Sequence, residues 1–416
     1  MLFGFVSQLL AISLRYLESL VANQSKEIIP NEWDHNVIID WLVNEGRFLP
    51  DLDKLVHQLG NHMINLGVPI SRLRMGIKTV HPLIAAYSTV WERDTGQSQH
   101  IANPHGLENR HIYIGSPLAY ISETGYSFRK RLLQELSSDD HESLHELKAR
   151  GATDYFGLPM KYTDQAFGVL IFVTDSTDGF EDTDVVHFTK IAAILAPITE
   201  SYRSRQIATA VAETYLGPRT GRKVLDGQIT RGHIQGINAA ILMSDIRDWT
   251  GLNDRLPADE VIALANGFFE IIADAVETNS GEILKFIGDA VLAIFPADDE
   301  NCSPKLACKN AFAAAKETLH RAANSEPSLG IEFGIGLHFG KVLYGNVGSK
   351  SRMDFTVSGK AVNTTARIES MCSKFDMPLL VSKEVAIHLD NEMQLISNET
   401  LKGYGSKINI FAPATS

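Results

Sequence analysis

The stretch NAAILMSDIRDWT, residues 238–250, decides the fold of the C-terminal half of the chain. Its apolar run predicts a buried strand at Asn238–Ser244, and Asp245 follows where that strand ends. A second stretch, EILKFIGDAVLAIF at residues 282–295, predicts a hairpin with Asp289 at its turn. Each carboxylate alone fits common turn chemistry. Two carboxylates held at strand ends can also bind a pair of divalent cations, which suits chemistry on a nucleotide phosphate.

The elements that follow residue 237 alternate between strand and helix patterns. The sequence predicts, after the first strand, a helix at Asp259–Thr278, the hairpin Glu282–Ile287 and Ala290–Phe295, an Ala-rich helix at Pro304–Ala323, strands at Ile331–His338 and Val342–Val347, and a helix at Ala361–Ser373. The order βαββαβ predicts an α+β fold with a ferredoxin-like core.

A third segment, FTVSGKAVNTTAR at residues 355–367, carries Asn363 and Arg367 four positions apart, on one face of the expected helix. Together with SDIRDWT and KFIGD, it resembles the catalytic domain of class III adenylate and guanylate cyclases. The resemblance covers about 180 C-terminal residues. It implies the ferredoxin-like catalytic fold and the conversion of a nucleoside triphosphate to a 3′,5′-cyclic nucleotide and pyrophosphate.

The resemblance also implies a role for each motif residue. Asp245, Asp289 and the backbone carbonyl of Ile246 match the positions that hold two Mg²⁺ or Mn²⁺ ions per active site. One ion lowers the pKa of the ribose 3′-hydroxyl, and the other draws charge off the triphosphate. By the same resemblance, three further residues contact the nucleotide: Asn363 orients the ribose, Arg367 stabilises charge on the α-phosphate, and Lys402 contacts the terminal phosphates.

Two residues match the positions where these cyclases bind the purine. Lys285 donates, which suits the adenine N1 acceptor, whereas guanylyl cyclases usually carry Glu there. Thr356 can accept a hydrogen bond from the adenine N6 amine, and Thr is typical of the subclass that includes bacterial bicarbonate-responsive cyclases. Because each buried group left unpaired costs about 1–3 kcal/mol, we expect ATP to be the substrate and GTP to be disfavoured.

Two rival functions stay open at this point, a guanylyl cyclase and a catalytically silent cyclase-like scaffold. Lys285 argues against the first. The second is left open because most relatives have Gly-Phe-Thr where this chain has Asp248-Trp249-Thr250, and an Asp beside the triphosphate adds negative charge or pairs with Arg247 or another cation. In the family, one protomer supplies the metal-binding carboxylates and the other supplies the base-reading residues, the Asn and the Arg. We therefore expect a homodimer with active sites at the subunit interface and an inactive monomer.

The whole chain has the composition of an ordinary globular protein. Its 416 residues predict two or three domains, and a net charge of −12 argues against sequence-independent nucleic-acid binding. The cysteines Cys302, Cys308 and Cys372 are odd in number and lack metal-ligand spacing, so we expect reduced thiols in a cytoplasmic protein. No window reaches 18 consecutive apolar residues, and we expect no transmembrane segment.

The domain organisation is expected in four parts: an N-terminal helix at 1–36, a sensor domain at 37–200, a helical linker at 201–236 and the catalytic domain at 237–416. The N-terminal helix is expected to pack on its own domain or a partner chain, with a membrane-surface anchor as the alternative. The linker is expected either to pack on its own domain or to form a parallel coiled coil between two chains.

The sensor domain is predicted to be α/β. Apolar residues at helical spacing run from Ile38 to Leu66, and strands are expected at Arg72–Thr79, Ile84–Trp91, Ala152–Tyr162 and Ala166–Asp175. A Gly-led apolar strand followed by FEDTD at 180–184 and a long helix is similar to GAF sensor domains. A PAS-like or another α/β module is the alternative. A small-molecule effector is left open, and the sequence names none.

Overall fold

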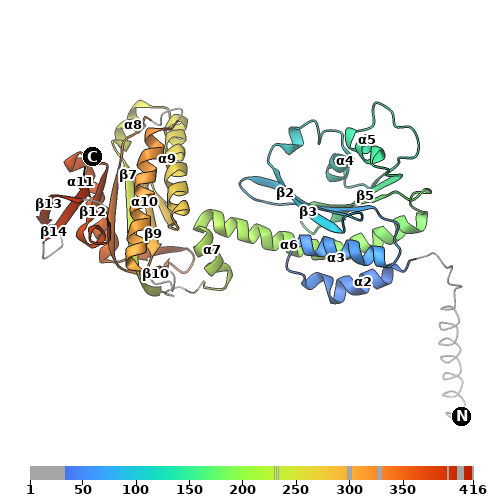
Figure 1. Cartoon of the computed structure of the whole chain (residues 1–416), viewed down its shortest axis with the longest axis horizontal. Coiled ribbons are helices and arrows are strands. Elements are labelled where there is room, and N and C mark those ends of the chain that lie inside the picture. The colour runs from blue at the N-terminus through green and yellow to red at the C-terminus, as the bar shows by residue number, and fades with distance from the viewer. Residues whose placement is uncertain are drawn as a thin grey trace, which may run out of the picture. The chain divides into compact units, whose positions relative to one another are not determined.

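The computed structural model describes residues 33–228, 230, 232, 234–297, 302–325, 330–390, 393–400 and 407–414. The chain divides into two compact units that meet between Ile207 and Ala208 (Figure 1). The finer division into four segments stays a prediction. The expected helix at 1–36 lies almost wholly outside the described residues, and Lys402 lies outside them as well.

The first unit is built on a six-stranded antiparallel sheet in the order β3-β2-β1-β6-β5-β4. Its strands are β1 (Arg72–Lys78), β2 (Ile84–Glu92), β3 (Gln97–Pro104), β4 (Phe128–Arg131), β5 (Asp154–Lys161) and β6 (Phe167–Thr174). The four predicted strands are confirmed as β1, β2, β5 and β6. The sequence analysis missed β3 because QSQHIANP is a mostly exposed edge strand without an apolar alternation.

Helices cover both faces of this sheet (Figure 1). One face packs against α2 (His35–Asn44), α3 (Leu52–Asn65) and α6 (Asp182–Leu216) around a large apolar core. The helical run expected from Ile38 to Leu66 is interrupted by a short 3₁₀ helix, Gly46–Phe48, before Asp51 caps α3 by accepting from the Lys54 amide. The other face carries α4 (Pro117–Thr124), α5 (Glu142–Ala149) and a smaller apolar cluster over β5 and β6.

The second unit confirms the ferredoxin-like core. Strands β7 (Ile234–Ile246), β8 (Glu282–Ile287), β9 (Ala290–Pro296) and β10 (Phe333–Gly348) lie in the antiparallel order β10-β7-β9-β8. One face is covered by α9 (Ala258–Thr278) and α10 (Pro304–Ala323), whose apolar sides form the core with alternate residues of β7 and β9. This is the βαββαβ arrangement that the alternation of elements predicted.

Additional elements extend this core. The remaining elements of the unit are α7 (Pro218–Leu225), α8 (Trp249–Arg255), β11 (Met353–Ser358), α11 (Lys360–Phe375), β12 (Leu379–Ser382), α12 (Lys383–Ala386), β13 (Met393–Thr400) and β14 (Lys407–Pro413). Where two strands were expected at Ile331–His338 and Val342–Val347, β10 is continuous. Residues Phe339–Lys341 stay in register with β7, so the ladder bridges the polar interruption.

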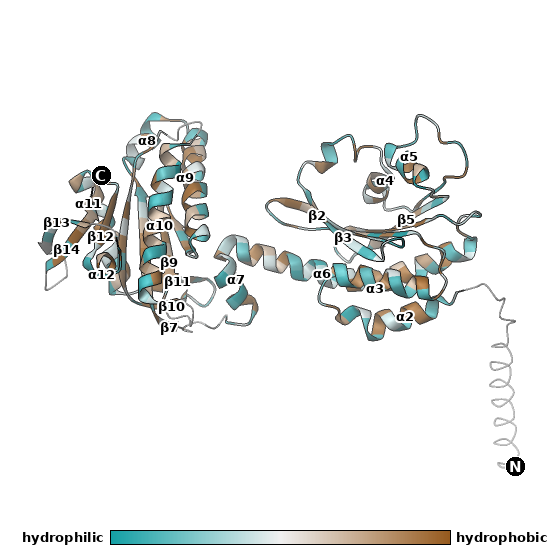
Figure 2. Ribbon diagram, viewed as in Figure 1, coloured by the Kyte–Doolittle hydropathy of each residue, from teal (hydrophilic) through white to brown (hydrophobic). Residues whose placement is uncertain are grey.

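Hydropathy follows this layering. Figure 2 shows apolar residues concentrated in the strands of both sheets, while helices such as α9 and α10 alternate between apolar and polar along their length. That alternation is expected of helices with one buried face. Among the residues that the structure describes, no helix has the length and apolar character needed to cross a membrane.

Two glycines let α11 lie directly against β10. A Cβ added at Gly336 would lie 2.5 Å from the Glu369 nitrogen, and one at Gly334 would lie 2.9 Å from Glu369 Oε1. Gly334 pairs with Asp245 across the β10–β7 ladder. The close approach therefore brings the carboxylate of Glu369 to the end of β7, on the sheet face opposite α9 and α10.

Candidate active site

The centre of the site is a pair of neighbouring carboxylates. Asp245 lies near the end of β7 opposite Ala290, and Asp289 directly precedes Ala290 at the hairpin turn. Oδ1 of Asp245 is buried without a hydrogen-bond partner among the described residues. Burial, followed by the hydrogen bond and the negative charge of Asp289, raises the pKa of Asp245 to about 6. A half-buried carboxylate with one buried, unpartnered oxygen, beside a second carboxylate, fits the oxygen ligands that a hard divalent cation prefers.

A third carboxylate, Glu369 on α11, lies beside this pair and was missed by the sequence analysis. Burial and then the charge of Asp245 raise the pKa of Glu369 to about 7; the Arg247 guanidinium acts in the opposite direction, and Asp289 adds to the rise. Within the described residues, no three His, Cys, Asp or Glu side chains converge closely enough to hold a metal ion. Glu369 is therefore a neighbour of the pair and not a third ligand in this structure.

Arg247 and Asp248, which follow Ile246, have separate partners. The Nη2 of Arg247 donates to the carbonyls of Cys372 (3.1 Å) and Met377 (3.0 Å), so Arg247 ties the end of β7 to the end of α11. Asp248 has a φ of 54° in the left-handed region and pairs with Arg255 at 2.9 Å. The sequence left open whether Asp248 pairs with Arg247 or with another cation, and the partner is Arg255. The added negative charge is balanced locally.

The two residues expected to bind the purine lie on adjacent strands. The Nζ of Lys285, on β8, lies 2.6 Å from Oδ2 of Asp354 on β11. Hydrogen bonding and then the charge of Lys285 hold the pKa of Asp354 below its usual value. Thr356 lies two residues along β11 on the same side as Asp354, while Phe355 and Val357 point into the core. Asp354 is a second residue that the sequence analysis did not identify.

Asn363 and Arg367 lie on the face of α11 that points away from the carboxylate pair. Asn363 is exposed, Arg367 is partly exposed, and neither side chain bonds to another described residue. Arg367 and Glu369 are two residues apart, about 200° around the helix axis. Since Glu369 lies on the side of α11 that packs on Gly334 and Gly336, Asn363 and Arg367 face away from the carboxylate pair of their own chain.

Comparison with known proteins identifies the second unit. Residues 235–411 match the family of the Adenylate and Guanylate cyclase catalytic domain. The C-terminal unit of this chain is a class III nucleotidyl cyclase catalytic domain. Domains of this class act on nucleotides and generally use divalent metal ions.

The match to individual proteins is confined to this unit. An uncharacterized protein of Mycobacterium tuberculosis is 37% identical over 181 residues, 42% of this chain and 31% of that protein. An adenylate cyclase of Anabaena cylindrica is 30% identical over 178 residues, 41% of this chain and 36% of that protein. The structure of a bacterial light-regulated adenylyl cyclase covers 43% of this chain and 91% of its own, with 27% identity and a TM-score of 0.37. The chain thus spans about a third of the length of these two relatives.

Proposed function

We propose that this chain is an adenylyl cyclase that converts ATP to 3′,5′-cyclic AMP and pyrophosphate as a homodimer. The observation that carries the proposal is the division of the site within one chain. The half-buried pair Asp245 and Asp289 lies on one side of α11, and Asn363 and Arg367 project from the other side without partners among the described residues. A second copy, related by two-fold symmetry, would bring the two halves together twice.

The cation half fits the family's metal requirement. Asp245, Asp289 and the backbone carbonyl of Ile246 would hold two Mg²⁺ or Mn²⁺ ions per active site. When bound, these ions lower the pKa of the ribose 3′-hydroxyl and draw charge off the triphosphate. Asp245 supplies an oxygen that has no other described partner.

The second half would bind the nucleotide from the partner chain. Asn363 orients the ribose, and Arg367 donates to the α-phosphate as negative charge develops during in-line attack by the 3′-oxygen. Lys402 would contact the terminal phosphates. No described residue bonds the Arg367 guanidinium, so binding a phosphate would break no contact within the chain.

The purine would be selected by Lys285 and Thr356. The ion pair with Asp354 holds the Lys285 ammonium in position, where it donates to N1 of adenine. Guanine presents a donor at N1 and would leave the ammonium facing another donor. An unpaired buried polar group costs about 1–3 kcal/mol, which supports ATP over GTP.

The exposed apolar residues of the unit support a partner at this face. Ile287 of β8 and Leu343 and Val347 of β10 are exposed large hydrophobic side chains. They flank the Lys285–Asp354 pair on paired or adjoining strands. Covering such a surface with a second copy removes apolar area from water.

The first unit is proposed to be a GAF-like sensor domain that regulates the cyclase. Its antiparallel sheet with a three-helix layer on one face supports this assignment. Helix α6 runs from Asp182 to Leu216 and so continues past the boundary between the units, which gives a covalent route for regulation. ATP as substrate and three free thiols support a cytoplasmic location.

The decisive experiment is complementation between two inactive variants. Asp289→Asn removes a metal ligand, and Arg367→Ala removes the phosphate contact; each homodimer should be inactive. In a co-expressed mixture, half of the dimers are mixed and each contains one intact site, so about a quarter of wild-type activity should return. Asp254→Asn, at an exposed α8 carboxylate, is the matched control and should keep full activity.

Each outcome decides a separate point. If neither ATP nor GTP gives product with Mg²⁺ or Mn²⁺, the chain is not a cyclase, and the catalytically silent scaffold is the remaining function. A faster rate with GTP would make the chain a guanylyl cyclase. An active wild type whose paired variants fail to complement would contradict the shared site.

A further inference from the structure

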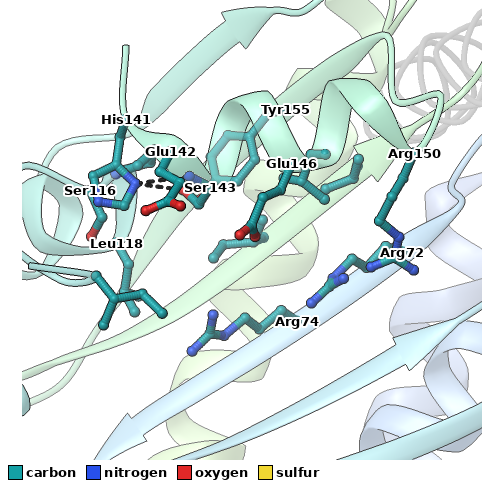
Figure 3. Close-up of a pocket in the computed structure, with 15 residues that line it drawn as sticks. Arg72, Arg74, Ser116, Leu118, His141, Glu142, Ser143, Glu146, Arg150 and Tyr155 are labelled. Carbon is teal, nitrogen blue, oxygen red and sulfur yellow. Dashed lines mark hydrogen bonds between the residues drawn. The ribbon is translucent and has the colours of Figure 1, made fainter. Parts of the chain in front are cut away.

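The first unit contains a cavity that the cyclase chemistry does not use. It has a volume of about 220 Å³ and lies between the sheet and helices α4 and α5 (Figure 3). Figure 3 shows Arg72 and Arg74 extending from β1 on one side, with α5 carrying Glu142 and Glu146 across from them. The apolar part of its wall is formed by Ile112, Pro117, Leu118, Leu147, Ile171 and Val173.

Arg74 is the unusual residue of this wall. Its Nε is buried without a hydrogen-bond partner, and among the described residues its bond is from Nη2 to the Ser88 hydroxyl at 3.3 Å. No carboxylate of the described residues pairs with it. Burial lowers the pKa of its guanidinium, but arginine stays charged in proteins. A desolvated cation without a counterion is costly.

The neighbouring arginines are neutralised within the chain, in contrast to Arg74. Glu92 accepts from Arg72 at 2.8 Å with one carboxylate oxygen and from Arg150 at 2.6 Å with the other. At this end of β1 and β2 the chain thus supplies a carboxylate for two structural arginines. Among the described residues it supplies none for Arg74.

Two other wall residues also offer hydrogen-bond donors. His141 accepts the Ser143 amide proton at Nδ1 (3.2 Å), which places the proton of the neutral ring on Nε2, and that nitrogen is buried without a partner. The Tyr155 hydroxyl forms no hydrogen bond with another described residue, and burial raises its pKa, so it is a neutral donor. Two buried donors without partners, Arg74 Nε and His141 Nε2, thus line the same cavity as the Tyr155 hydroxyl, and this set suits an acceptor-rich ligand.

We propose that this cavity binds a small aliphatic carboxylate, whose oxygens accept from Arg74, His141 and Tyr155. The guanidinium fork matches a carboxylate, and the apolar wall fits a short hydrocarbon chain. A volume of about 220 Å³ suits an acid of a few carbons.

Glu146 allows the effect of charge on ligand binding to be tested in the opposite sense to Arg74. It is exposed on α5 and lies on the opposite wall, where its negative charge opposes an incoming anion. Its neutralisation should strengthen binding, whereas loss of Arg74 should weaken it. A purely structural role for the arginine predicts no such opposite pair of effects.

The test measures binding to the full chain directly, so its result does not depend on cyclase activity. Butyrate, succinate and inorganic phosphate are titrated calorimetrically at neutral pH and constant ionic strength. We expect saturable binding of butyrate or succinate at one site per chain, at least tenfold weaker in Arg74→Met and several-fold tighter in Glu146→Gln. Arg47→Met, which removes an exposed guanidinium near the α2–α3 helices, should bind as the wild type does.

Several results would overturn the proposal. Absence of saturable binding at about 10 mM, which saturates any site with a Kd near 1 mM, removes the ligand class. Tighter binding of phosphate than of both carboxylates does the same. Unchanged affinity in folded Arg74→Met removes the site. Should Arg74→Met fail to fold, unchanged or weaker binding in Glu146→Gln, an exposed substitution, still overturns it.

Discussion

The carboxylate pair of the second unit and the arginine cavity of the first unit differ in the sign of the charge that each leaves unbalanced. Oδ1 of Asp245 and Nε of Arg74 are both buried without described partners, one on an anion and one on a cation. Asp154, which is wholly buried, shows how the same chain treats a structural charge. Its Oδ2 lies 2.9 Å from Arg129 and 3.3 Å from Arg131, so two guanidinium groups balance it even though its Oδ1 has no partner. Where the chain leaves a buried charge unbalanced, the counterion is expected from outside.

The largest effect should follow from removing Asp245, the carboxylate proposed to bind the metal ions. Asp245→Ala removes the buried oxygen offered to the metal ions, and turnover should fall on the order of 10³-fold, since metal charge stabilisation is worth several kcal/mol. Product formation from ATP with saturating Mg²⁺ or Mn²⁺ measures it. Asp254→Ala is the control, and comparable activity in the two variants would contradict the metal assignment.

The structural charge should show its effect in stability and not in ligand binding. Asp154→Ala leaves Arg129 and Arg131 without their shared carboxylate, and the free energy of unfolding should fall by about 3 kcal/mol. Urea denaturation followed by circular dichroism measures it. Asp182→Ala, which removes an exposed carboxylate 3.4 Å from Arg129, should cost less than about 0.5 kcal/mol. Equal effects would show that burial does not distinguish the two carboxylates.

The fold of the second unit was predictable because its strands and helices have clear apolar patterns. β7 and the β8–β9 hairpin follow from their apolar runs, and the βαββαβ order follows from their spacing. The continuity of β10 was not predictable, since HFGK at 338–341 breaks the apolar pattern and only the ladder with β7 holds it extended. In the first unit, the polar edge strand β3 gave no local signal for the same reason.

The candidate site was predictable where a motif carries it. Asp245 and Asp289 are neighbours, as expected from the two strand ends. Glu369 and Asp354 were not found, because their importance comes from contacts across the sheet. Gly334 and Gly336 bring Glu369 near Asp245, and the pairing of β11 with β10 places Asp354 within 2.6 Å of Lys285 on β8. Arg74 was not found either, because an alternating strand does not reveal whether an outward arginine is covered by a helix.

Lys285 differs from Arg74 because Asp354 balances its charge. Its substitution should have an effect of intermediate size, on nucleotide selection. Lys285→Met removes the donor to adenine N1, and the preference for ATP over GTP should fall about tenfold to a hundredfold, or about 2 kcal/mol. The ratio of kcat/KM for the two nucleotides measures it. Lys350→Met, at an exposed lysine, is the control. An unchanged ratio would contradict the purine-reading role.

The smallest effect concerns the stability of the metal-free chain. Asp245 has a raised pKa of about 6, so the folded state keeps a proton that an unfolded Asp, with a pKa near 3.9, has released. The free energy of unfolding should therefore fall as the pH rises from about 4 to about 6. Asp289→Asn removes the like charge and should flatten this fall. Above pH 6 it should stabilise the metal-free protein by about 1 kcal/mol, a figure reduced for the solvent exposure of Asp245.

Metal ions should reverse the order of stability of the wild type and Asp289→Asn. Adding Mg²⁺ should stabilise the wild type by neutralising the carboxylate pair, and it should stabilise Asp289→Asn much less because the variant has lost a ligand. Thermal unfolding with and without Mg²⁺ measures both, with Asp254→Asn as the variant expected to follow the wild type. Should Asp289→Asn destabilise the metal-free protein above pH 6, the two carboxylates would be held by protein contacts, as Asp154 is. The Asp245–Asp289 pair would then not differ from Asp154, and its negative charge would not be unbalanced.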